Sequence, residues 1–273
     1  MTTPDLVTAL RAVLAGDPGH GALEVVHQPV VGVAAGTPLG AEALVRWHHP
    51  RWGTLPPESF VPVAERAGLG LQLDTHVLRG ALGQVAAWDA DGVRVHRVGV
   101  NLGRTSLHSP ALVDLVRQAC DLAGALPDRL VVEVVEQHEL TLTPARLAGL
   151  QALADADVTL ALDDFGAGYA RVGLLAQLPF GVLKVDRSLL PGPHRAAAPS
   201  APEARRVLAG VVALAGALGL EVTVEGVETA AHHALVTGLG VPHAQGWFYA
   251  PAMPADVFAD WWRARVATVA TAG

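Results

Sequence analysis

The alternation of short apolar runs with longer segments of helical length is the feature of this sequence that most constrains its fold. Regular β–α alternation predicts an α/β fold with a mainly parallel sheet, and eight such units predict a TIM-type (β/α)8 barrel. We expect strands at 24–31, 40–47, 95–102, 130–136, 158–164, 182–186, 221–225 and in a stretch that ends at 245–247. We expect helices near 58–68, 71–89, 110–124, 144–156, 170–178, 202–219, 229–239 and 254–268.

The first two expected strands depart from this pattern. Only residues 32–39 separate them, and Gly36 and Pro38 are turn formers, so no return helix fits between the strands. Neighbouring strands joined by so short a connection run antiparallel. We therefore expect a barrel with an antiparallel first strand, and we expect residues 1–273 to form a single domain, since this is a usual length for one barrel.

Composition argues against several classes of protein. The net charge of −7 disfavours a surface that coats nucleic acid, so we expect no DNA partner. The single cysteine, Cys120, excludes an internal disulfide and fits a reducing compartment. The apolar stretch 207–220 is too short to cross a bilayer, and residues 1–5 lack the features of a signal peptide. We expect a cytoplasmic protein with no membrane association.

Polar side chains stand in or at the ends of successive expected strands. In "LALDDFGAGYA" (160–170), Asp163 and Asp164 close an apolar run, where burying two like charges is costly unless a cation or donor compensates. A single carboxylate at a strand end is more often a cap or an ion-pair partner than a functional group. Here, however, barrel topology would bring many strand-end groups together in one mouth. The other members are Glu42, Asn101, Glu133, Lys184, Glu225 and Gln245. The carboxylate and amide oxygens of this set suit Mg²⁺ or Mn²⁺.

Several motifs resemble, in order, the signatures of the EAL-domain family, which are bacterial phosphodiesterases for the second messenger cyclic di-GMP. The resemblance extends from "HQPVV" (27–31) to "QGWFYAPAM" (245–253) and includes "HPRWGTLPPESFVPVAERAGL" (49–69). The motifs are "EAL" (42–44) with Arg46, "VEVVE" (132–136), "DDFGAG" (163–168), "LKVDRS" (183–188), "VEGVET" (224–229) and "QGW" (245–247).

The resemblance implies hydrolysis of cyclic di-GMP to linear pGpG by a two-metal mechanism, with two Mg²⁺ or Mn²⁺ ions in each site. It implies the first metal's ligands to be Glu42, Asn101, Glu133 and Asp163, and the second's to be Asp163, Asp164 and Glu225. Lys184 would act in catalysis with Glu42 and Glu225, by positioning the attacking water or stabilising charge at phosphorus. Arg46, Gln28 and Gln245 would contact substrate or water, while Glu136, Glu228 and Asp186 would support the site.

Two positions depart from the family pattern. Ala167 and Val135 stand where the family commonly has threonine, and Ala167 loses a hydroxyl that can brace the loop 163–168. The alternative function is therefore a cyclic di-GMP receptor or protein-interaction module that has lost the chemistry. Every implied ligand and the lysine are present, which favours the enzyme.

The sequence also suggests partners and aromatic residues at the surface of the site. We expect a homodimer through the segment 169–178, and regulatory input from a sensor or regulatory protein or from further regions. Trp47 is expected to pack in the core, whereas Trp247 and Phe248 either pack or flank a guanine base.

Overall fold

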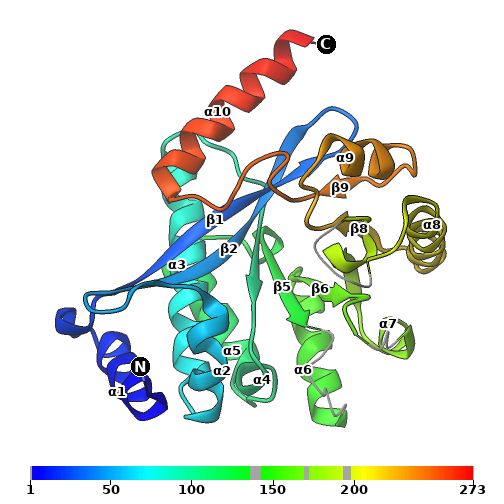
Figure 1. The fold of residues 1–273 in the computed structure, drawn as a ribbon. Helices are drawn as coiled ribbons and strands as arrows, with labels where there is room; N and C mark the ends of the chain where they lie inside the picture. Colours follow the sequence, from blue (N-terminus) through cyan, green and yellow to red (C-terminus); the bar gives the residue numbers. More distant parts are fainter. Residues whose placement is uncertain (1, 136–142, 169–171, 193–197, 273) are drawn as a thin grey trace.

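A closed barrel forms the centre of the computed structural model, which describes residues 2–135, 143–168, 172–192 and 198–272 (Figure 1). Within these residues the strand order is β1-β9-β8-β7-β6-β5-β4-β2, and β1 pairs again with β2 to close the ring, while β3 extends the sheet beyond β2. The strands are β1 Ala22–Gly32, β2 Thr37–His49, β3 Gly53–Leu55, β4 Arg97–Asn101, β5 Leu130–Val135, β6 Thr159–Phe165, β7 Phe180–Val185, β8 Glu221–Val224 and β9 His243–Ala244.

Strand directions confirm the predicted fold class, a TIM-type barrel with an antiparallel first strand. β1 runs antiparallel to β2, with Ala22 opposite His48 and Gly32 opposite Thr37, and it is also antiparallel to β9. From β2 through β4 to β9, consecutive barrel strands are parallel. Because the carboxyl ends of the parallel strands share one face, polar residues far apart in the sequence meet there.

Helices surround the barrel (Figure 1). Among the described residues, no helix has both the length and the apolar character that a membrane span requires. Short 3₁₀ turns lie at Pro18–His20, Pro127–Arg129 and Arg187–Leu189. The α-helices are α1 Thr3–Leu14, α2 Pro57–Arg66, α3 Gly70–Ala90, α4 Arg104–Leu107, α5 Leu112–Ala123, α6 Pro144–Asp155, α7 Val172–Gln177, α8 Ala201–Leu218, α9 Ala230–Thr237 and α10 Ala255–Ala272.

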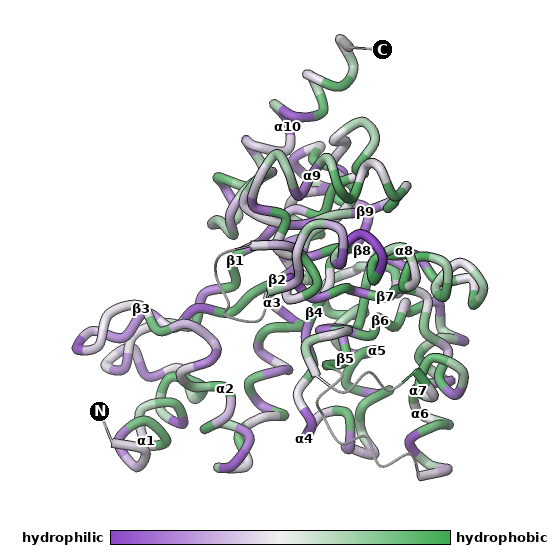
Figure 2. Tube along the Cα trace, turned by 45° about the vertical axis from the view of Figure 1, so that its right-hand side comes forward, coloured by the Kyte–Doolittle hydropathy of each residue, from purple (hydrophilic) through white to green (hydrophobic). Residues whose placement is uncertain are grey.

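The main hydrophobic core lies between the strands and the helices. Trp47 on β2 is fully buried, as predicted, and its indole Nε1 donates to the His20 carbonyl oxygen at 2.9 Å. Trp88 of α3 stacks on Phe258 of α10 with ring centroids 4.7 Å apart, which fixes the C-terminal helix to the barrel. Figure 2 shows hydrophobic residues along the barrel strands and hydrophilic residues at the turn beside β3.

Several elements differ from the sequence-based expectation, and the four-residue helix α4 is one that was not predicted. Helix α1 was not predicted, although Thr2 and Asp5 form a capping box at its start and Leu6 and Leu10 are buried against the core. Strand β3 was not predicted either, and it prolongs the hairpin by pairing with the end of β2. The last strand, β9, ends before the "QGW" motif instead of within it.

A candidate metal site at the carboxyl ends of the strands

Buried acidic side chains converge inside the barrel near the carboxyl ends of its strands. Glu42 lies on β2, Glu133 on β5 and Asp163 on β6, and their exposed fractions are only 6%, 3% and 6%. Strand pairing aligns them, since Asn101 lies opposite Glu133 and Val135 lies opposite Asp163. The topology therefore brings together residues that the sequence separates by as many as 121 positions, from 42 to 163.

Lys184 lies within this acidic cluster. Its Nζ is 2.7 Å from Glu133 Oε2, 2.8 Å from Glu225 Oε1, and 3.2 Å from both Glu42 Oε2 and Asp163 Oδ1. Burial alone would lower the pKa of Lys184, but the surrounding carboxylates raise it well above its usual value. The lysine therefore stays charged and offsets part of the negative charge of the cluster.

Lys184 is also the only lysine among the 19 Lys and Arg side chains of the chain. An ammonium is a compact charge that can contact several carboxylates at once, whereas a guanidinium is planar and larger. A chain that uses arginine at every other basic position thus keeps lysine where four carboxylates share one cation.

Three amide side chains add hydrogen bonds to the cluster. Asn101 Nδ2 donates to Glu42 Oε1 at 2.8 Å and to Glu133 Oε2 at 3.1 Å. Gln245 Nε2 donates to Glu42 Oε2 at 2.8 Å and to Gln28 Oε1 at 3.0 Å. Although burial raises the pKa of Glu42, Lys184 and these donors outweigh it and lower that pKa. Glu42 is accordingly charged at neutral pH.

The remaining carboxylates carry more negative charge than one lysine offsets. Burial, with repulsion from neighbouring carboxylates, raises the pKa of Glu133 well above its usual value and the pKa of Glu225 to about 8. Burial and the charges of Asp163 and Asp186 raise the pKa of Asp164 to about 6. This excess of buried acid is the electrostatic condition for binding further cations.

The oxygen atoms form two overlapping groups that fit divalent cations. Glu42, Glu133 and Asp163 each place a carboxylate oxygen within 4.8 Å of the others, and so do Asp163, Asp164 and Glu225. Asp163 belongs to both groups. Carboxylate oxygens are the donors that Mg²⁺ and Mn²⁺ prefer.

Backbone geometry at two positions shapes this cluster. Asp164 adopts a left-handed conformation with φ of +59°, and its backbone N–H donates to Asp163 Oδ1 at 2.9 Å. This conformation is uncommon outside glycine but is accessible to aspartate. On β4, a Cβ on Gly99 would overlap Glu133 Oε1, so the absence of a side chain there leaves room for the carboxylate.

A cavity of about 390 Å³ opens above the cluster. At its edge, the side chain of Arg187 is 66% exposed and Trp247 is 71% exposed. The cavity is lined by Gln28, Glu42, Leu44, Glu58, Asp163, Asp164, Asp186, Arg187, Glu225, Gly226, Glu228, Gln245, Gly246 and Trp247.

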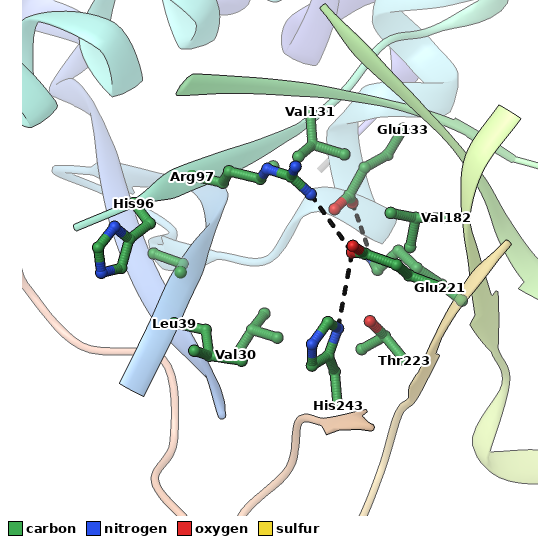
Figure 3. A pocket seen from close by; sticks show the side chains of 14 residues that line it. Val30, Leu39, His96, Arg97, Val131, Glu133, Val182, Glu221, Thr223 and His243 are labelled. Atoms are coloured by element: carbon green, nitrogen blue, oxygen red, sulfur yellow. Dashed lines mark hydrogen bonds and ion pairs between the residues drawn. The ribbon is translucent and has the colours of Figure 1, made fainter. Parts of the chain in front are cut away.

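A second cavity, of about 320 Å³, lies at the amino ends of the strands (Figure 3). Arg97 and His243 approach Glu221 there, at 3.3 and 3.9 Å. Glu133 and Lys184 line this cavity and do not line the cavity at the carboxyl ends.

The comparison with protein families matches the EAL domain model over residues 11–252. The chain belongs to the EAL domain family. This match confirms the resemblance to the family, because it covers the barrel strands and the motifs from "EAL" (42–44) to "QGW" (245–247).

Characterised relatives of this EAL domain are known from Pseudomonas aeruginosa. It is 35% identical over 230 residues to the bifunctional diguanylate cyclase/cyclic di-GMP phosphodiesterase MucR, covering 84% of this chain and 33% of MucR. It is 34% identical over 242 residues to the cyclic di-GMP phosphodiesterase NbdA, covering 89% of this chain and 30% of NbdA. The chain thus spans about a third of the length of these relatives.

Solved structures of the family have the same fold. A PaMucR phosphodiesterase in complex with c-di-GMP matches with a TM-score of 0.83 and 33% identity, over 93% of this chain and 99% of that chain. The EAL domain of Mycobacterium smegmatis DcpA matches with a TM-score of 0.73 and 27% identity, over 89% of this chain and 98% of that chain.

Most of the predicted site residues of this EAL domain lie in or beside the cluster. The cavity lining includes Gln28, Gln245, Asp186 and Glu228 in addition to the carboxylates Glu42, Asp163, Asp164 and Glu225. Glu136 lies outside the described residues. The predicted dimer segment 169–178 is described from α7 onward, where Leu174 and Leu175 are buried, so it offers less apolar surface than expected. The homodimer stays a prediction, which sedimentation velocity would measure.

Arg46 is the one predicted substrate contact that the structure does not bring into the cavity lining. It lies on the same face of β2 as Glu42 but four residues further along, and its Nη1 donates to the Val45 carbonyl oxygen at 2.9 Å. Two lining residues, Glu58 and Arg187, were given no role from the sequence. Arg187 directly follows Asp186 in "LKVDRS", so its position in that motif was the available signal.

Proposed function

We propose that this EAL domain hydrolyses cyclic di-GMP to linear pGpG with two divalent metal ions. The observation that carries the proposal is the pair of overlapping carboxylate groups that share Asp163 beneath an open cavity. The phosphodiesterase names of MucR and NbdA support the same substrate.

The donor set suits the proposed ions. Glu42, Asn101, Glu133 and Asp163 would hold one, and Asp163, Asp164 and Glu225 the other. In the structure Asn101 turns its Nδ2 toward the carboxylates, so the amide would turn over to present its oxygen as a ligand. Divalent ions bound there would supply charge that neutralises the phosphodiester and lowers the pKa of the water used for attack.

Lys184 would act by its charge. Since its pKa is raised, it stays protonated and cannot accept a proton from water. Its ammonium would instead stabilise negative charge that develops at phosphorus, a contribution made mainly in the transition state.

Metal dependence is the first test of this function. We expect Mg²⁺ or Mn²⁺ to support conversion of cyclic di-GMP to pGpG, and we expect a chelator to abolish this conversion. Chromatography of substrate and product measures the rate. Ca²⁺ should permit substrate binding with little turnover, because its larger radius and looser coordination spoil the required geometry. Comparable rates in Ca²⁺ and Mg²⁺ would contradict the two-metal proposal.

Trp247 is the proposed stacking surface for a guanine base. Its indole is exposed at the edge of the cavity, and stacking on an aromatic ring is worth about 1–3 kcal/mol per base. We expect Trp247→Ala to raise KM about tenfold with kcat little changed, whereas Trp247→Phe keeps an aromatic face and restores most of the affinity. A loss confined to kcat would remove this role.

A further inference from the structure

We propose that Glu65 and Asp74 are positioning residues, which hold the turn after β4 and thereby fix the Asn101 amide within the cluster. This inference rests on the proposed function only in assuming that the cluster binds divalent metal. It also assigns a role to Glu65 in the segment 49–69. Of that segment, only Glu58 lines the cavity above the cluster.

Asp74 holds the turn from helix α3. The side chain comes from the second turn of that helix, and the residue is 6% exposed. Its Oδ2 accepts a hydrogen bond from the Gly103 backbone N–H at 2.7 Å. A buried carboxylate aimed at a backbone N–H two residues after Asn101 restrains the path of that turn.

From helix α2, Glu65 holds the start of helix α4, which directly follows this turn. Its Oε2 accepts from both the backbone N–H and the hydroxyl of Thr105, at 3.1 and 2.7 Å. A Cβ on either Gly103 or Gly70 would overlap Glu65 Oε1. The carboxylate is thus packed directly against the backbone of the turn and of the start of α3.

The turn leads straight to the cluster. Between Asn101 and Gly103, the Leu102 N–H donates to the Glu133 carbonyl oxygen at 3.1 Å. The turn is therefore held by β5 on one side and by the two carboxylates on the other. Asn101 Nδ2 then contacts both Glu42 and Glu133, so a shift of the turn changes the position of one proposed ligand relative to two others.

The structure offers a matched control on the same helix. Asp89, at the opposite end of α3 from Asp74, forms an ion pair with Arg129, with oxygen–nitrogen distances of 2.9 and 3.2 Å. Asp89 anchors the other end of the barrel. A purely stabilising role would make Asp74→Ala and Asp89→Ala behave alike.

The test measures Mn²⁺ affinity by titration calorimetry on the full chain. We expect Asp74→Ala and Glu65→Ala to raise the Mn²⁺ Kd about tenfold or more, the effect usual for groups that orient metal ligands. Asp74→Asn, which keeps an acceptor oxygen for the Gly103 N–H, should recover most of the affinity. Asp89→Ala should lower Tm without changing the Kd. Should either alanine variant fail to fold, Thr105→Val removes one donor to Glu65 and should produce a smaller rise in Kd.

A second readout requires no metal. In ¹⁵N–¹H spectra of the metal-free protein, the Asn101 side-chain amide signal, assigned by its loss in Asn101→Asp, should move in Asp74→Ala but not in Asp89→Ala. Wild-type protein that fails to bind Mn²⁺ would overturn the proposed function, and the amide signal would still decide the positioning role. An unmoved amide signal, or an Mn²⁺ Kd equal to wild type in all the Glu65, Asp74 and Thr105 variants, would overturn the positioning role itself.

Discussion

Replacing Glu42 by glutamine should reduce the turnover of cyclic di-GMP by at least about a hundredfold, the upper end of what loss of a metal ligand's support costs. Glu42 accepts hydrogen bonds from Asn101, Gln245 and Lys184, and its lowered pKa keeps it charged. Glutamine has nearly the same volume but places an NH₂ group among these donors. The variant therefore loses a charged oxygen and gains a donor that faces other donors. The measurements are kcat at saturating Mg²⁺ and the Kd for Mn²⁺.

The control for this variant is Glu24→Gln on the neighbouring strand β1. Glu24 is an exposed partner of His48 and lies outside the cavity lining, so its neutralisation should leave turnover unchanged. Wild-type turnover in Glu42→Gln would contradict the proposed metal site. If the wild-type protein binds cyclic di-GMP but never cleaves it, the receptor function is favoured, and Ala167 in the loop 163–168 would be the first position to restore to threonine.

The sequence predicted the fold because the barrel is encoded locally. Apolar runs separated by helix-length segments leave little choice but a parallel sheet, and a connection as short as 33–36 between β1 and β2 forces that pair to be antiparallel. Elements at the edges were harder to predict. Helix α1 packs by a few buried residues, and β3 has only three residues, too few for a periodic signal.

The site was predictable to the extent that topology alone brings strand ends together. Glu42, Glu133, Asp163 and Glu225 were identified because each closes or lies within a strand, and the barrel requires those ends to converge. Topology does not predict which of the side chains on a shared face extend into the cavity. Arg46 shares a face with Glu42, but the sequence does not indicate that it stands outside the cavity lining.

The positioning residues Glu65 and Asp74 were not identified from the sequence, for a different reason. Asp74 and Glu65 contact backbone groups 29 and 40 positions away, and a side chain that binds a backbone N–H leaves no complementary residue in the sequence. A buried acid in a helix of otherwise apolar inward positions is the available signal. On α3, Asp74 shares the buried face with Leu73, Val77 and Leu78.

Lys184→Met should destabilise the metal-free protein more than the metal-bound protein. The Nζ of Lys184 lies within 3.2 Å of four carboxylates. Removing one partner of a buried ion pair costs about 3–5 kcal/mol, which lowers Tm by roughly 10 °C in a domain of this size. Ions that bind only the folded state should restore much of that stability.

Thermal unfolding in chelator and in Mg²⁺, together with kcat, tests this account of the only lysine in the chain. We expect Lys184→Met to show a large Tm loss in chelator, a smaller one in Mg²⁺, and a kcat reduced by orders of magnitude with KM little changed. Lys184→Arg keeps the charge but cannot fit a planar guanidinium among four carboxylates spaced for an ammonium, so it should not restore kcat. Equal Tm losses with and without Mg²⁺ would mean that the proposed ions do not compensate for the lost charge of Lys184 in the cluster. Full activity in Lys184→Arg would mean that positive charge alone, and not its compact form, is what the site requires.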